Sequence, residues 1–350
     1  MSSEAVELFL LPESKKLLLI DGYSRKYKNN HQYISMDLCK LIILHFTFHF
    51  DFLIVFEKEN EDEVNELICY DMKSKYKIVK NNNIWKYNWN TSYCIHKTIN
   101  DCLIYRIGGE NNKQVPNIEY SLKHDNHIEL PLSQTVRYGS STIFNTLNGL
   151  ITIGGRDNND GNYLSTVEIM NDKKQWKYLE SMNIERYDCS STTFENKIFV
   201  FGGYNLSSNE MYSFDNNNII NTNNKWINLN NMKNNRYVNG IKYYQIKNQI
   251  ILIGGYYDEN YKSFEMFDII KNEFIEYPNT LEKHRRKPGI VIENNNLIYI
   301  IGDNLYDRSS YGVIECFDIR DNKWFIIDKL DTILEFGNEK RYAQCVLNFI

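Results

Sequence analysis

A glycine pair that recurs at a nearly constant interval constrains this 350-residue chain more than any other feature. Each pair follows a short apolar run, and the five copies are Gly108-Gly109, Gly154-Gly155, Gly202-Gly203, Gly254-Gly255 and the variant Gly302-Asp303. The second positions of successive pairs are 46, 48, 52 and 48 residues apart. Self-similarity at a fixed period predicts one repeat architecture rather than two unrelated domains.

Three further markers follow the glycine pairs in a constant order. An apolar run ends in a large apolar residue followed by Asp or a similar residue, as in Phe317-Asp318. A second run carries an aromatic residue, such as Trp176, and a Leu or Met then stands four residues before an arginine, as with Met182 and Arg186. Four ordered markers, each found in three or more copies, indicate units of four short strands joined by turns.

The periodicity within each unit predicts an all-β fold. Short apolar runs between turn residues, without a long helical pattern, are typical of antiparallel meanders. A four-stranded sheet cannot bury both of its faces alone, whereas sheets stacked around an axis cover one another and leave only short edges. The glycine pair would supply positive φ at the strand exit, and the aromatic residue would fill the wedge between sheets. We therefore expect a β-propeller with four-stranded antiparallel blades.

These units resemble the kelch-repeat family of β-propellers. That family repeats an apolar strand, a Gly-Gly pair, a spaced Tyr or Phe and Trp, and an Arg that opens the next unit. The resemblance is clear from Arg137 to Ile327 and weaker from Cys102 to Tyr120. It implies a single kelch propeller domain over residues 1–350, with clear repeats at 102–330 and degenerate repeats at 15–90.

The number of blades depends on two degenerate copies near the N-terminus. Asp21-Gly22 is half of a glycine pair, and Glu57-Lys58 stands where a pair would be expected. The two copies are only 36 residues apart, which is short for a blade. Counting both predicts seven blades, which we favour; if 41–56 forms only one strand pair, the number is six.

The C-terminal segment is expected to close the ring. Residues 341–350 look like the first strand of a unit whose other strands are missing, and they begin with the Arg-Tyr pair found in other repeats. The strand that completes this unit would be Lys16–Ile20, although Glu7–Leu11 could fill the same position as the closing segment. We favour 341–350 as the closing strand.

An arginine with a neighbouring tyrosine or arginine opens five of the repeats. In kelch propellers this turn lies at one mouth of the central channel, and its arginines often contact ligand. A ring of guanidinium groups would suit an acidic or phosphorylated peptide, because arginine presents a fixed fork to carboxylate and phosphate oxygens. Alternatively, a neighbouring carboxylate or carbonyl holds each arginine as part of the framework. The candidate partner-binding residues are Arg137, Tyr138, Arg186, Tyr187, Arg236, Tyr237, Arg285, Arg286, Arg341 and Tyr342.

The loops after the glycine pairs form a second candidate surface. They differ from repeat to repeat, for example Arg156–Tyr163 and Tyr204–Asn209. Varied loops on a repeated frame often carry specificity, and the tyrosines found in them are favoured interface residues.

The sequence contains no recognisable catalytic, cofactor-binding or metal-binding motif. His45 and His49 alternate in a strand-like run, which places them about 13 Å apart and too far to share a metal ion. His124 and His127 lie in a polar turn. No nucleophile elbow, phosphate-binding loop or dinucleotide fingerprint is present. We expect no cofactor and a non-catalytic protein; the alternative is a propeller enzyme that acts on a small sugar or acid at the channel mouth.

Charge and cysteine content indicate the surroundings of the protein. The net charge is −5, so the chain lacks the basic field that attracts nucleic acid or anionic membranes. Seven scattered cysteines without a C-x-x-C motif favour a reducing compartment, and no apolar run reaches membrane-spanning length. We therefore expect a monomeric, cytoplasmic scaffold that binds a protein or peptide partner.

Overall fold

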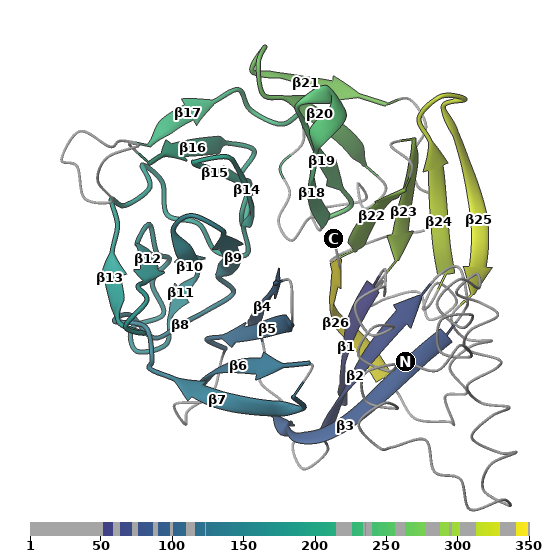
Figure 1. Ribbon diagram of the computed structural model, residues 1–350. Helices are drawn as coiled ribbons and strands as arrows, with labels where there is room; N and C mark the ends of the chain where they lie inside the picture. Colours follow the sequence, from purple (N-terminus) through teal and green to yellow (C-terminus); the bar gives the residue numbers. More distant parts are fainter. Residues whose placement is uncertain are drawn as a thin grey trace, which may run out of the picture.

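The computed structural model shows six four-stranded antiparallel sheets arranged around a common centre (Figure 1). The structure describes residues 52–58, 64–71, 76–86, 90–98, 101–109, 116–122, 124–214, 226–233, 235, 240–255, 263–277, 288–293, 296–301, 313–329 and 341–348. Across these ranges, no helix has the length and apolarity needed to span a membrane.

Four of the sheets are meanders in which consecutive strands pair in chain order. The first contains β4 (Ser92–Lys97), β5 (Cys102–Ile107), β6 (Asn117–Ser121) and β7 (Asn126–Leu130). The second contains β14 (Ser190–Phe194), β15 (Lys197–Phe201), β16 (Asn209–Ser213) and β17 (Ile227–Leu229). The third contains β18 (Gly240–Tyr244), β19 (Gln249–Ile253), β20 (Phe264–Asp268) and β21 (Glu273–Glu276), and the 3-10 helix η1 (Gln245–Lys247) connects β18 to β19. The fourth contains β22 (Gly289–Glu293), β23 (Leu297–Ile301), β24 (Val313–Asp318) and β25 (Lys323–Lys329).

The fifth sheet carries an additional two-stranded ribbon. The sheet consists of β9 (Ser141–Asn145), β10 (Gly149–Ile153), β12 (Val167–Met170) and β13 (Trp176–Tyr178). The ribbon pairs β8 (Arg137–Tyr138) with β11 (Arg156–Asp157), so that Arg156 lies opposite Tyr138. The ribbon therefore joins the opening turn of this repeat to the loop after its glycine pair.

The sixth sheet combines the C-terminal strand with three strands from the first quarter of the chain. Its order is β26 (Arg341–Asn348), β1 (Phe52–Lys58), β2 (Val64–Asp71) and β3 (Tyr76–Lys86). The ladder between β26 and β1 runs from Phe52 opposite Asn348 to Lys58 opposite Arg341. The neighbour of β26 is thus β1; the partner expected from the sequence, Lys16–Ile20, and the alternative Glu7–Leu11 lie outside the described residues.

Six sheets close the ring in the described part of the chain. Their inner strands contact one another in the cyclic order β26, β4, β9, β14, β18 and β22, and β22 contacts β26 again. The favoured count of seven blades is therefore not supported, whereas the all-β propeller with four-stranded antiparallel blades is confirmed. The seven-blade count relied on two degenerate copies: Glu57-Lys58 ends β1, and Asp21-Gly22 lies outside the described residues.

The hydrophobic core is divided into wedges between neighbouring sheets. Trp176 and Trp226 are both buried in such wedges. The indole Nε1 of Trp176 donates to the Pro131 carbonyl at 2.8 Å, and Nε1 of Trp226 donates to the Glu180 carbonyl at 2.8 Å. Each tryptophan therefore fills the space between two blades and bonds its own blade to the preceding one. The wedge around Trp226 contains Ile143, Ile151, Ile153, Val167, Ile169, Met182, Cys189, Ile198, Val200, Tyr212 and Phe214.

The glycine pairs have the backbone conformation that the sequence predicts. Gly154 and Gly155 have φ angles of +59° and +102°. The Gly154 amide donates to the Thr166 carbonyl at 3.0 Å, and the Gly155 amide donates to the Arg186 carbonyl at 2.7 Å. The glycine turn of one repeat is thereby bonded to the opening turn of the next.

We expect Gly154→Ala to destabilise the protein by more than about 2 kcal/mol. Its positive φ alone costs an alanine about 1–2 kcal/mol, and the added Cβ would clash with the Arg186 carbonyl oxygen. Equilibrium unfolding in urea measures the loss. Leu147→Ala is the control, because Leu147 is exposed and its replacement should change stability by less than about 0.5 kcal/mol. Equal urea midpoints for Gly154→Ala and the unmodified protein would contradict the role of this turn.

Candidate functional site

Arg186 is buried inside its own blade and is fully bonded there. Its Nη1 donates to the carbonyls of Gly202 at 2.7 Å and Ser208 at 2.6 Å. Its Nε and Nη2 donate to Glu210 Oε1 at 3.2 and 2.9 Å. Neither side chain of the Arg186–Glu210 ion pair is exposed to solvent.

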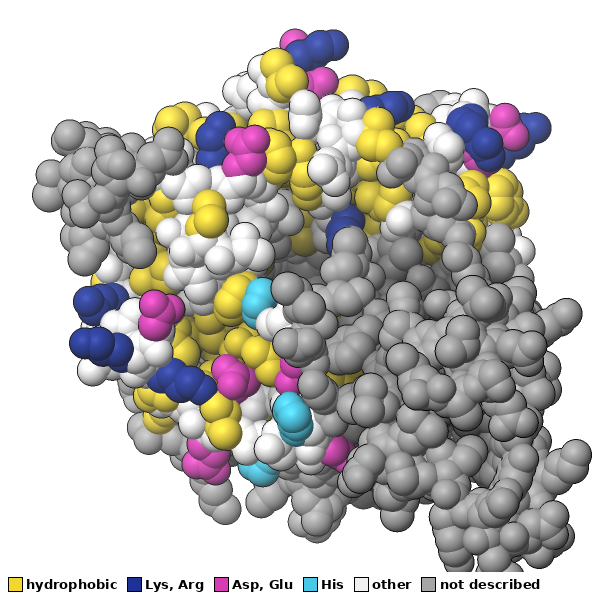
Figure 2. Space-filling view, viewed as in Figure 1, with side chains coloured by type: hydrophobic (Ala, Val, Ile, Leu, Met, Phe, Trp, Pro, Cys, Tyr) yellow, Lys and Arg dark blue, Asp and Glu magenta, His cyan; other side chains and the backbone are white. Residues whose placement is uncertain are grey.

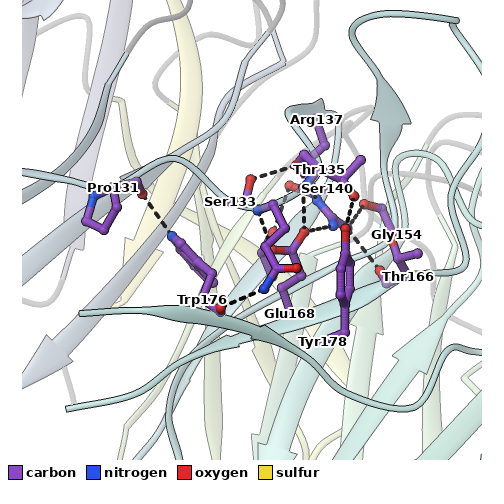
Figure 3. Close-up of polar contacts among 12 residues, drawn as sticks. Pro131, Ser133, Thr135, Arg137, Ser140, Gly154, Thr166, Glu168, Trp176 and Tyr178 are labelled. Carbon is purple, nitrogen blue, oxygen red and sulfur yellow. Dashed lines mark hydrogen bonds and ion pairs between the residues drawn. The ribbon is translucent and has the colours of Figure 1, made fainter. Parts of the chain in front are cut away.

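Arg137 has the corresponding contacts in the preceding blade (Figure 3). Its Nη1 donates to the carbonyls of Gly154 and Thr166, each at 2.9 Å, and its Nη2 forms a close ion pair with Glu168. Both side chains of this ion pair are fully buried. Burial lowers the pKa of Arg137 from its ordinary value, while Glu168 opposes that shift.

These contacts correct the expectation that the repeated arginines line a solvent-facing mouth. The forks of Arg137 and Arg186 are occupied by a glutamate and two carbonyl groups of the same blade, so neither is available to a partner. Four of the other predicted residues, Arg236, Tyr237, Arg285 and Arg286, lie outside the described residues. For Arg341 and Tyr342 the structure gives only the backbone, in β26.

Sequence reasoning missed the glutamates that hold these arginines. Glu168 and Glu210 lie in the third strand of their sheets, at the position that Glu265 and Glu315 occupy in two other sheets. All four are buried. A signal was available for Glu168, because a charged residue inside the otherwise apolar strand Val167–Met170 requires a partner.

The tyrosines of the opening turns lie in contact with tyrosines from the glycine loops. Tyr187 stacks on Tyr163, with ring centroids 5.6 Å apart and an interplanar angle of 8°. The ring centroid of Tyr204 lies 6.1 Å from that of Tyr163 and 6.4 Å from that of Tyr187. Tyr138 is buried and packs edge-on against Tyr187 at 5.8 Å. We call Tyr163, Tyr187 and Tyr204 the tyrosine cluster.

The tyrosine cluster is partly exposed and rests on a bonded framework. Tyr163 and Tyr204 are 37% and 41% exposed. The Tyr204 amide donates to the Tyr187 carbonyl at 2.8 Å, and Asn90 Nδ2 donates to the Tyr187 hydroxyl at 3.0 Å. The repeats that begin at Arg137 and Arg186 contribute the rings, so packing between two blades fixes the arrangement.

Arg156 lies against the tyrosine cluster and is half-buried. Its guanidinium carbon is 5.8 Å from the ring centroid of Tyr163 and 5.9 Å from that of Tyr138. Its Nε donates to the Gly161 carbonyl at 2.5 Å. The cluster therefore carries a positive charge at one end, supplied by a loop whose sequence differs between repeats.

No large field of one charge covers the described part of the face shown in Figure 2. Acidic and basic side chains are dispersed there among hydrophobic and uncharged ones. Recognition of a charged partner on this face would therefore depend on individual contacts rather than on a long-range field.

Histidines do not form a metal site among the described residues. His96 in β4 stacks on Phe144 in β9, with ring centroids 3.7 Å apart. Burial lowers the pKa of His96. His124 and His127 are exposed in and beside a turn, and no group of three or more His, Cys, Asp or Glu side chains in the described ranges could hold a metal ion. His45 and His49 lie outside those ranges.

A ring of four-stranded meanders with glycine turns and wedge tryptophans defines a β-propeller of the kelch type. A family model for the KLHDC2/KLHL20/DRC7 Kelch-repeats domain matches residues 139–347, which is more than half of the chain. The protein belongs to this kelch-repeat family, and the resemblance seen in the sequence is confirmed.

Comparison with solved structures agrees on the fold. The chain is similar to the protein described as "Structure of YjhT", with a TM-score of 0.59 and 12% sequence identity, over 76% of this chain and 91% of that chain. A likeness at this identity supports the fold alone. A search of curated proteins finds no match.

Proposed function

We propose that this protein is a non-catalytic interaction module that binds a segment of a partner protein across the tyrosine cluster. Kelch propellers typically serve as protein-interaction scaffolds and are in general not enzymes. The observation that carries the proposal is the group of partly exposed rings of Tyr163 and Tyr204, stacked and packed against Tyr187. Tyrosine is among the residues that contribute most to protein interfaces.

The arrangement of the rings favours binding because it is already ordered. Contacts between Tyr163, Tyr187 and Tyr204 restrict their rotamers before a partner arrives. These tyrosine side chains therefore lose less conformational entropy when a partner segment packs on them than mobile side chains would. The hydroxyl groups can in addition exchange hydrogen bonds with the backbone of a bound segment.

We expect the double variant Tyr163→Ala/Tyr204→Ala to weaken partner binding by at least about tenfold, since one interface residue of this kind contributes about 2 kcal/mol. The measurement is recovery of co-purified proteins by quantitative mass spectrometry, with thermal melting of the same samples. Tyr178→Ala is the matched control, because Tyr178 is 48% exposed on the outer strand β13. Partners recovered equally with the double variant and the unmodified protein would place the binding surface elsewhere.

A further inference from the structure

We propose that Arg156 makes the tyrosine cluster selective for a carboxylate side chain, so that the partner segment is recognised through an aspartate or a glutamate. This inference rests on the proposed function, because it specifies which chemical group of the partner the tyrosine cluster recognises. It also names a specificity residue that lies outside the repeated Arg-Tyr pairs.

The guanidinium group of Arg156 is held in place, but within the described residues its two terminal nitrogens have no hydrogen-bond partner. The Nε bond to the Gly161 carbonyl at 2.5 Å and the rings of Tyr138 and Tyr163 at 5.9 and 5.8 Å fix its position. In the described part of the chain, Nη1 and Nη2 of Arg156 form no hydrogen bond or ion pair. A carboxylate accepts two parallel hydrogen bonds from such a fork.

Arg156 differs in this respect from the other four arginines whose side chains the structure describes. Arg106, Arg137 and Arg186 are buried. Arg320 is 63% exposed, but its Nε and Nη2 donate to Asp318 in its own turn. Within the described ranges, Arg156 alone combines partial exposure with a free pair of terminal donors.

The acidic residues of the same loop are already engaged. Asp157 Oδ1 accepts a hydrogen bond from the Asn159 amide at 2.6 Å. Asp160 accepts from the amide and the side chain of Asn162, at 2.9 and 2.8 Å. A basic partner would find these oxygens partly occupied, whereas a carboxylate would find an unoccupied fork. The two aspartates also disfavour a doubly charged phosphate more than a singly charged carboxylate, which is why we assign the carboxylate.

Tyr204 supplies the second part of the site. It is the most exposed ring of the tyrosine cluster and contacts Tyr163, which lies between Arg156 and Tyr187 in the stack. An acidic residue bound at the guanidinium end would leave this ring free for an apolar neighbour in the same segment. The expected motif is therefore an aspartate or glutamate beside an apolar residue.

A peptide array tests the assignment. Each spot fixes one central residue, which is Glu, Asp, Gln, Lys or phosphoserine, and randomises its neighbours, with amidated C-termini. The unmodified protein should favour Glu and Asp over Gln by about tenfold to a hundredfold, the range of a charge-assisted fork contact. Arg156→Ala should lose this preference, Arg156→Lys should keep only part of it because it lacks the fork, and Arg320→Ala should retain it.

Several outcomes would overturn the assignment. They are a preference for Lys, a stronger signal for phosphoserine than for Glu, or an acidic preference that persists in Arg156→Ala. Binding of the unmodified protein without any charge preference would refute the role of Arg156 but leave the proposed function standing. Unchanged array binding by Tyr163→Ala/Tyr204→Ala would instead refute the proposed function. Thermal melting of each variant verifies that the fold is retained.

Discussion

Arg186→Ala is expected to destabilise the propeller by about 3–5 kcal/mol, the cost of removing one partner from a buried ion pair. Glu210 has no solvent exposure, and after the substitution the hydrogen bond that remains to its carboxylate, among those described, is the one from the Asn183 amide. The carbonyls of Gly202 and Ser208 would lose the same donor. A buried charge and two carbonyls would thus lose their shared partner in one step.

Urea unfolding of three variants separates the ion pair from general effects of substitution. Arg186→Ala should lower the midpoint strongly. The double variant Arg186→Met/Glu210→Met should recover much of the loss, because it removes both charges and refills the space. Arg320→Ala breaks a pair within one turn in which the Arg320 side chain is 63% exposed, and Asp318 keeps the hydrogen bond from the Arg320 amide, so the loss should be about 0–1 kcal/mol. An Arg186→Ala protein as stable as the unmodified one would mean that Arg186 is not part of the framework.

Much of the fold could be predicted from the sequence because its signals are local and repeated. The glycine pairs require positive φ, and Gly154 and Gly202 have φ angles of +59° and +60°. Asparagine favours turns, and Asn248 and Asn272 have left-handed backbone conformations there. The number of blades is not a local property. It depends on how many sheets are needed before the inner strands meet again, and degenerate repeats such as the one ending at Glu57-Lys58 carry little of that signal.

The candidate site was less predictable than the fold. The two residues of a repeated Arg-Tyr pair are adjacent in the sequence, but their side chains lie in different environments. In the turn that contains Arg186 and Tyr187, the arginine points into the blade toward Glu210 and the tyrosine joins the surface cluster. Glu210 lies 24 residues away in another strand, so neighbouring residues in the sequence do not reveal the pairing. Arg156 belongs to a loop whose sequence varies between repeats. That its two terminal nitrogens have no partner among the described residues follows only from the folded loop, in which Nε bonds to Gly161 and the guanidinium lies over Tyr163.

Closure of the ring carries a different kind of cost from a single buried contact. In the meander sheets, the inner strand is joined to its neighbour by a short turn, so the two pair without a large loss of chain entropy. The innermost strand of the sixth sheet instead comes from the other end of the chain. Pairing of β26 with β1 is a contact between residues almost 300 positions apart, and the rest of the ring must bring these strands together.

Deletion of residues 341–350 is therefore expected to remove the cooperative native state. The deleted segment includes the whole of β26, which pairs with β1 and also contacts β22 and β4. Its ladder contains seven register pairs, and at about 0.5–1.5 kcal/mol for each hydrogen bond the loss approaches the total stability of a typical domain. The exposed edge of β1 would in addition favour aggregation.

The measurement is thermal unfolding followed by circular dichroism, with size-exclusion chromatography to detect aggregates. Deletion of residues 349–350 alone is the control, because it leaves β26 intact and should melt like the full chain. A synthetic peptide with the sequence of residues 341–350, added to the truncated protein, should restore part of the cooperative transition by pairing with β1. If the chain without residues 341–350 melts at the same temperature as the full chain, β26 is dispensable and another segment must close the ring.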